Sequence, residues 1–268
     1  MYSPGVVPFT VNSVDSIIEG FRGTPYSGYQ SPSIWTQLGY PDRRRQVFQF
    51  LSDAQDAYAK QQVKNQIGLF APVFNWASWD SLAVSQDEIN QFSFNGIDPN
   101  TQWSPYHFRV FADAAHAFFL NSSDSLAEKV VMRCAGYLNN NYYARNSLMA
   151  ITDIPPIVEP QANYPEPHAA ALILRGALFA NLAGGNPNIT FPLIIHTYRF
   201  IKSEYIESGL MEGSWAKSQP EFTQDGETYK EFFLFWQMEV LETLALLLTY
   251  KDQLTLPPCG VGFVEDSI

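Results

Sequence analysis

Positive charge and long apolar runs are both scarce in this chain. Its 268 residues include 16 Lys and Arg against 27 Asp and Glu, giving a formal net charge of −11 and a pI of about 4.7. An acidic surface repels phosphate backbones and anionic lipid, so we expect no nucleic-acid partner. No run approaches the ~18 apolar residues of a transmembrane helix, so we expect no membrane insertion. The N-terminus also lacks the basic and apolar regions of a secretory signal, which predicts a soluble protein without a Sec signal peptide.

Cysteine and the short motifs of metal or nucleophile chemistry are nearly missing as well. Cys134 lies in an apolar helical stretch and Cys259 in a Pro-Pro-Cys-Gly segment, and neither has a second cysteine at CxxC spacing. There is no HExxH and no G-x-S-x-G. We therefore expect no metal and no cofactor. The sequence leaves open a disulfide between the two cysteines.

Charged residues of both signs are few, whereas aromatic residues are abundant. Charged residues make up 16% of the chain, below the usual quarter, and aromatic residues make up 15%. Such a composition predicts extensive buried or shared surface. An obligate subunit of an assembly has this composition, and so does a protein with a sugar-binding cleft.

Four aromatic residues, Tyr40, Trp103, Tyr164 and Tyr229, precede apolar helical runs at spacings of 61 to 65 residues. A period near sixty fits two helices plus a long loop. The apolar spacing and the capping residues predict helices at 42–62, 103–120, 189–206 and 229–252. They also predict a helix capped by Ser123 or Asp124 that runs to Tyr137, and a helix that starts at Pro165 or Pro167 and runs to Leu182. We expect the four helix starts to lie at one end of the fold. The last helix is the most apolar, and we expect it at the centre.

The predicted fold class is mainly α, an array of antiparallel helical hairpins with long aromatic loops. Residues 1–40 are rich in Pro, Gly, Ser and Tyr, and we expect an extended N-terminal arm that docks on another subunit. Residues 41–256 form the predicted helical-hairpin domain, and residues 257–268 form a C-terminal tail.

Two resemblances add to this reading. The segment Gly209–Trp215, GLMEGSW, is similar to the Gly-Ser-Trp turns of α/α-toroid proteins, which include polysaccharide lyases and glycosidases. This resemblance implies an incomplete α/α-toroid over roughly residues 100–252. The segments EPHAAALILRGALFANLAGG, MEGSW and YKEFFLFWQMEVLETLALL also resemble tail-associated virion structural proteins of tailed phages.

Candidate catalytic residues cluster after two of the aromatic positions. His107 and His168, with Glu166 and Arg145, supply the residue types that a toroid lyase uses as its base and to neutralise a substrate carboxylate. The alternative is that each histidine caps or packs against a helix start. Glycoside hydrolysis would instead need two carboxylates, and loop acids such as Asp80, Asp98, Glu166, Glu212 and Glu221 offer such pairs or are simply solvated.

Loop aromatics form the candidate binding set: Trp76, Trp79, Trp103, Tyr164 and Trp215. Exposed, they stack on sugar rings or anchor a protein interface, whereas buried they close the ends of the hairpins. The missing export signal and the docking arm favour a non-enzymatic structural subunit of a phage virion, in its tail or baseplate, with carbohydrate as a second partner. A toroid-type polysaccharide lyase or glycoside hydrolase is the alternative.

Overall fold

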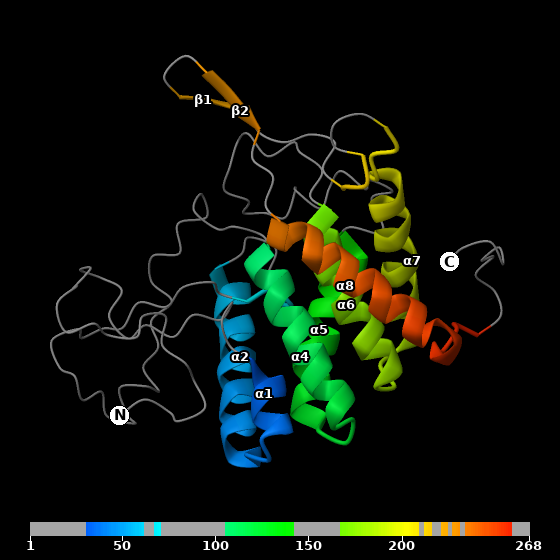
Figure 1. Ribbon diagram of the computed structural model, residues 1–268. Coiled ribbons are helices and arrows are strands. Elements are labelled where there is room, and N and C mark those ends of the chain that lie inside the picture. Colours follow the sequence, from blue (N-terminus) through cyan, green and yellow to red (C-terminus); the bar gives the residue numbers. More distant parts are fainter. Residues whose placement is uncertain are drawn as a thin grey trace, which may run out of the picture.

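The computed structural model confirms a mainly α protein (Figure 1). It describes residues 31–61, 67–70, 105–141, 167–208, 212–215, 221–224, 227–230 and 234–258. The α-helices in these ranges are α1 (Pro32–Gln37), α2 (Pro41–Gln61), α4 (Pro105–Leu120), α5 (Ser125–Asn141), α6 (Pro167–Leu182), α7 (Pro187–Ser203) and α8 (Leu234–Tyr250). A 3₁₀ turn (Lys251–Gln253) follows α8, and β1 (Glu221–Gln224) pairs antiparallel with β2 (Glu227–Lys230).

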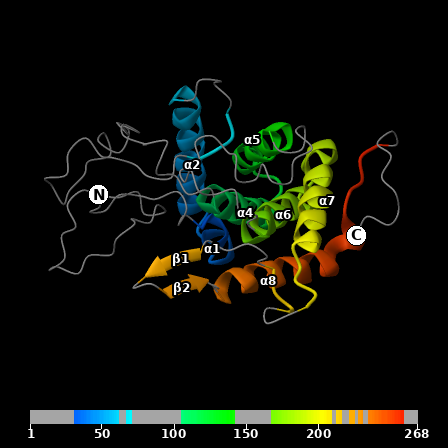
Figure 2. The same cartoon turned by 90° about the horizontal axis from the view of Figure 1, so that it is seen from above.

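The helices form successive hairpins around two central members. Short turns join α1 to α2, α4 to α5 and α6 to α7, and the paired helices contact each other. Figures 1 and 2 show α4 and α6 in the middle, with α2 and α5 on one side and α1 and α8 on the other. Fourteen of the sixteen residues of α6 are buried, so this helix forms the centre of the core.

The small residues of α6 let it pack closely against α4. At Gly176, an added Cβ would lie 2.3 Å from the ring of Phe111, so only glycine allows this approach without a shift of the ring. The helix then ends as its sequence predicts. Gly184 adopts a φ of 94°, which favours glycine, and the N–H of Gly185 donates to the carbonyl of Ala180 at 2.8 Å. This is the Schellman arrangement, which satisfies a carbonyl of the last turn.

The observed starts of α4, α6 and α8 lie at one end of the fold, and the start of α2 does not. The starts of α6 and α8 lie together, because His168 stacks on Trp236. The ends of α4 and α8 also lie together, because Phe119 contacts Tyr250. These three helices are therefore parallel. Near the start of α2, however, Arg44 donates to the carbonyl of Ala117, which lies near the end of α4. The shared-end prediction is wrong for α2, because α1 precedes it and makes it the second helix of a hairpin.

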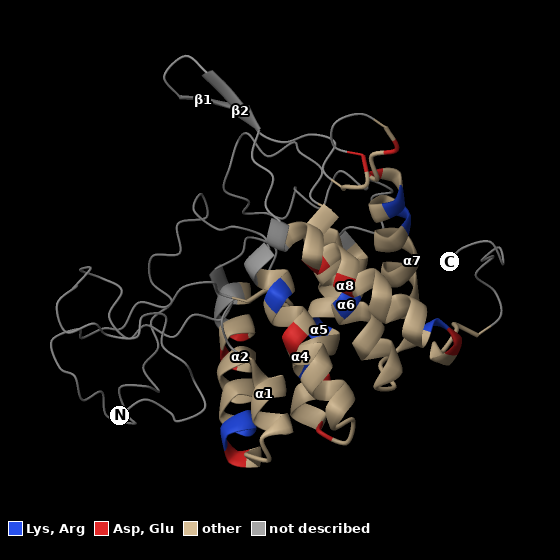
Figure 3. Ribbon diagram, in the orientation of Figure 1, with Lys and Arg blue, Asp and Glu red and all other residues tan. Residues whose placement is uncertain are grey.

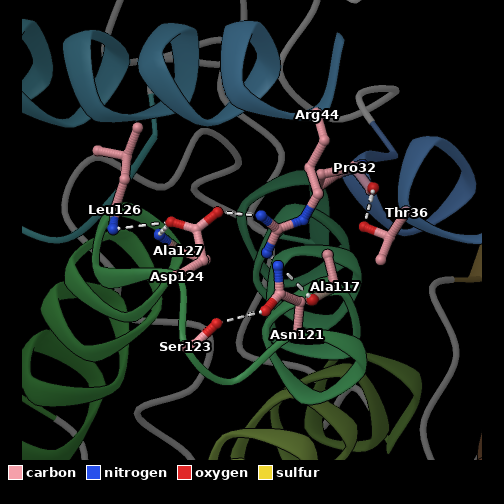
Figure 4. Close-up of polar contacts among 9 residues, drawn as sticks. All are labelled: Pro32, Thr36, Arg44, Ala117, Asn121, Ser123, Asp124, Leu126 and Ala127. Atoms are coloured by element: carbon pink, nitrogen blue, oxygen red, sulfur yellow. Dashed lines mark hydrogen bonds and ion pairs between the residues drawn. The ribbon is translucent and has the colours of Figure 1, made fainter. Parts of the chain in front are cut away.

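An ion pair with a buried arginine joins α2 to the residue that precedes α5 (Figure 4). Arg44 of α2 pairs with Asp124, which also accepts hydrogen bonds from the backbone N–H groups of Leu126 and Ala127. Of the two capping residues that the sequence offers, Ser123 and Asp124, Asp124 therefore caps α5, and it binds α2 with its second oxygen. Residues 32–37 of the predicted arm form α1, which packs on α2 and α4, whereas residues 1–30 lie outside the described residues.

The expected central position of the last helix is wrong. α8 lies on the outside of the bundle, against α6 and α4 (Figure 2). Its side chains Met238, Leu241 and Leu248 are exposed. It also begins later than predicted, because Tyr229 lies in β2 and the helix starts at Leu234. Its apolar composition comes from two apolar faces, only one of which meets the core. No helix in the described ranges is both long and apolar enough to cross a bilayer.

Candidate functional site

Both predicted catalytic histidines are buried. His107 is 2% exposed, and its Nδ1 accepts a hydrogen bond from the backbone N–H of Phe70 at 3.1 Å. His168 is 4% exposed and lies flat on Trp236, with ring centroids 4.2 Å apart. Burial lowers the pKa of each histidine to about 3, and the charge of Arg109 adds to this effect at His168. A general base works best exposed to its substrate and with a pKa near the working pH. Packing accounts for both histidines better than such a role does.

The other predicted catalytic residues, Glu166 and Arg145, lie outside the described residues, as do Asp80 and Asp98. Glu212 is exposed at the turn before Trp215. Glu221 lies in β1, where the structure describes only the backbone. No pair of carboxylates in the predicted set is therefore brought together in the described part of the chain.

Trp215, from the predicted binding set, is a packing residue in this structure. It is 8% exposed, and its ring centroid lies 5.4 Å from that of Tyr205. Its backbone N–H donates to Oε1 of Gln237 in α8 at 3.0 Å. Gly213, with a φ of 88°, shapes the turn that brings it there. This turn ties the end of α7 to the start of α8. Trp76, Trp79, Trp103 and Tyr164 lie outside the described residues.

A group of charged side chains that sequence reasoning missed lies where α4, α6 and α8 meet, and we call it the polar seam (Figure 3). Its members are Arg109 and Asp113 of α4, Arg175 of α6, and Glu239, Glu242 and Thr243 of α8. Arg109 pairs with Glu239 at 2.6 Å and Arg175 pairs with Glu242 at 3.1 Å. Nε of Arg175 also donates to Thr243 at 3.3 Å. The seam therefore joins the surface helix α8 to both central helices.

Asp113 of the polar seam has a carboxyl whose pKa lies near neutrality. Burial raises the pKa of its carboxyl to about 6, although the neighbouring charges of Arg175 and Arg109 act to lower it. A carboxyl with such a pKa exchanges a proton under physiological conditions and is chemically suited to acid–base work. Ion-pair networks of purely structural origin also shift pKa values in this way.

Two polar atoms of the polar seam have no hydrogen-bond partner among the described residues. These atoms are Oε2 of Glu239 and Nη2 of Arg175, both buried. The seam holds two arginines against three carboxyls, so its net charge is zero or negative, depending on whether Asp113 is protonated. It therefore offers no surplus positive charge for an acidic sugar or a phosphate.

The sequence did carry a signal for the polar seam. Arg109 and Asp113 stand four residues apart in a helix that holds no other Asp, Glu, Lys or Arg, and so share one face of α4. Glu239 and Glu242 stand three apart in the most apolar segment of the chain. Isolated charges in such helices are costly to bury unless they are paired, and pairing the two patterns would have predicted the contact.

Metal and thiol chemistry gain no candidate within the described ranges. No three His, Cys, Asp or Glu side chains there gather closely enough to hold a metal ion. Cys134 is a free, buried cysteine whose pKa is raised by burial, so its thiol is a small core group. Cys259, its possible disulfide partner, lies outside the described residues.

Comparison with known proteins gives no match to a family model and no match to a curated protein.

Proposed function

We propose that this chain is a non-enzymatic subunit of a large protein assembly. The observation that carries the proposal is the surface position of α8. Its inward face packs on the core through Val240, Thr243 and Leu247, while Met238, Leu241 and Leu248 on its other face are 54%, 48% and 68% exposed. A helix that is apolar all round is normally buried on all sides. Among the described residues nothing covers this second face, as expected of a surface that other subunits cover.

The assembly we propose is a phage virion, with the chain in its tail or baseplate. The sequence resemblance to tail-associated proteins favours this assembly, and its segments map onto α6, the turn before Trp215 and α8. We also propose that the helical hairpins form an incomplete α/α-toroid. The parallel arrangement of α4, α6 and α8 supports it, because a toroid stacks the first helices of successive hairpins in this way.

Glycan contact stays a secondary part of the proposal. The residues proposed to contact a glycan are Trp76, Trp79, Trp103 and Tyr164, because Trp215 is buried against Tyr205. The proposed docking role of the N-terminal arm rests on its composition alone.

The test is particle composition. We expect purified particles, banded on a density gradient, to contain the chain in a fixed ratio to the major structural proteins, measured by quantitative mass spectrometry. Its absence from particles that are otherwise complete would overturn the virion proposal. A chain that merely adheres to particles would be removed by a high-salt wash, whereas an integral subunit would remain.

The alternative, a toroid-type lyase or hydrolase, is favoured by one observation, the near-neutral pKa of Asp113 beside Arg109 and Arg175. Assays of reducing ends and unsaturated uronates over a glycan panel test it. Turnover that is lost in Asp113→Asn or His168→Ala, but kept in the surface variant Leu38→Glu, would replace the structural proposal with the enzymatic one.

A further inference from the structure

The segment that follows α8 is held on the bundle by one buried side chain, Asn181 of α6, which is 1% exposed. Its Nδ2 donates to the carbonyl of Thr255 at 3.0 Å, and its Oδ1 accepts from the N–H of the same residue at 2.8 Å. Nδ2 also donates to the hydroxyl of Thr190 in α7 at 2.9 Å. The amide therefore pairs with residue 255 through the backbone alone, as a neighbouring β-strand does.

Few other contacts fix this segment, which leaves α8 at the edge of the bundle (Figure 1). Lys251–Gln253 form an exposed 3₁₀ turn, and Leu256 is 63% exposed. Leu254 has an extended backbone and packs part of its side chain against the core. Within the described part of the chain, residues 254–258 make no hydrogen bond to the helices besides the two to Asn181.

We infer that Asn181 is a binding site for an extended peptide backbone, and that residues 254–258 form a strap that fills this site and can leave it while the helices stay folded. Release of the strap leaves the contacts between helices in place. Because the side chain of Thr255 is exposed, the amide recognises the backbone and not the side chain. Any extended segment that presents one free N–H and one free C=O at this spacing fits the same amide. The site does not depend on the proposed assembly role.

The small number of contacts sets the expected population of the open strap. Local openings that expose little apolar surface have free energies well below that of global unfolding. Opening removes two hydrogen bonds and the partial burial of one leucine side chain. We therefore expect on the order of one strap in a hundred to be open at equilibrium.

Trypsin cleavage after Lys251 measures this release, since the turn that contains Lys251 must unwind to enter a protease and the strap holds the end of that turn. The product, residues 252–268, is followed by mass spectrometry at early times. In the wild-type chain we expect the rate to stay nearly constant at urea concentrations below the global transition, because a local opening exposes little surface. A rate that rises with urea in step with global unfolding would overturn the inference.

Thr255→Pro and Thr255→Ala are a matched pair of variants. Proline has no N–H, so it leaves the buried Oδ1 of Asn181 without its donor, whereas alanine keeps both backbone hydrogen bonds. We expect Thr255→Pro to speed the cleavage at least about tenfold and Thr255→Ala to leave it within about twofold of wild type. Circular dichroism should show the same helical content in both. Equal cleavage rates, or a loss of helix in Thr255→Pro, would contradict a separately releasable strap.

A peptide supplied in trans tests the class of ligand. The probe is residues 251–258 as a capped peptide, KDQLTLPP, added at up to about 5 mM to the ¹⁵N-labelled Thr255→Pro chain. We expect the side-chain NH₂ signals of Asn181 to shift with a dissociation constant on the order of millimolar, because the contacts are few. The control peptide, with proline in place of its threonine, should cause no shift. If neither peptide shifts the signals of the released chain, the binding site is refuted and Asn181 is a packing residue.

Discussion

Acid should destabilise this protein through the two buried histidines, and the structure gives the sign and the size. The pKa of His107 and the pKa of His168 are both lowered to about 3 in the folded chain, with burial as the main cause. The unfolded chain, with an ordinary histidine pKa of about 6.5, binds more protons between these values. Stability is therefore complete above about pH 6.5 and is lost as the pH falls toward 3.

The magnitude follows from about 1.4 kcal/mol per pH unit for each proton that only the unfolded state binds. At pH 5, each histidine lowers the free energy of unfolding by about 2 kcal/mol, and the two together lower it by about 4 kcal/mol. Asp113 acts in the opposite direction, because its pKa is raised to about 6 and the folded chain therefore binds its proton before the unfolded chain does. This titration adds about 1 kcal/mol to the free energy of unfolding between pH 6 and pH 5. The net loss of about 3 kcal/mol is a large part of the stability of a typical domain.

The assay is urea unfolding at pH 8 and at pH 5, followed by circular dichroism. His168→Phe keeps an aromatic ring against Trp236 but cannot bind a proton, so it should reduce the difference between the two pH values by about 2 kcal/mol. Using the difference removes any loss that the substitution causes at both pH values. His116→Phe is the matched control, because His116 also stacks on a ring, that of Phe179, but is only half-buried. Its effect on the difference should be smaller.

Titration of the histidine Cε1–H signals by NMR checks the premise directly. We expect the signals of His107 and His168 not to shift between pH 8 and pH 5, since a pKa near 3 leaves both rings neutral over this range. A midpoint near pH 6 for either residue, or a full pH 8 to pH 5 difference in the His168→Phe variant, would refute the reasoning.

Three further predictions use the same unfolding assay. Asp113→Asn should increase the loss of unfolding free energy between pH 8 and pH 5 by about 1 kcal/mol, because it removes the carboxyl whose protonation opposes that loss. Gly176→Ala should destabilise by about 1–3 kcal/mol by crowding Phe111, whereas Gly136→Ala in α5, where an added Cβ meets nothing within 4 Å, should stabilise by up to about 1 kcal/mol. Asn181→Leu should cost about 2–3 kcal/mol, because Asn181 accepts from and donates to the backbone of residue 255 and so ties the segment after α8 to α6. Equal signs for the two glycine variants, or a neutral Asn181→Leu, would contradict the packing described.

Helix positions were largely predictable from the sequence, because capping and apolar spacing are local signals. The predicted start of the helix at 42–62 matches the start of α2 within a residue, and the cap of α5 is one of the two residues predicted for it, Asp124. The return helix α7 starts at Pro187 rather than residue 189, because Asn186 caps it by accepting from the N–H of Asn188. Pro192 therefore lies inside the helix and not in its first turn.

The arrangement of the helices was harder to predict, because it depends on which residues of distant segments meet. The aromatic period placed α2 in the same class as α4, α6 and α8, but the short α1 before it shifts its role within the hairpin. A Pro-, Gly- and Ser-rich neighbourhood hid α1, whose six residues carry little helical pattern. The polar seam was missed for a related reason: each charge was visible, but its partner lay up to 130 residues away, as for Arg109 and Glu239.

The misplacement of α8 has a physical cause that also supports its proposed role. Apolar composition on all sides of a helix predicts burial without saying whether the covering surface comes from the same chain. For α6 that surface is internal, since α4, α7 and α8 surround it. For α8 the core covers one face and leaves Met238, Leu241 and Leu248 exposed. If other subunits cover this face, as we propose, the expectation of burial is correct for the assembly and wrong only for the isolated chain.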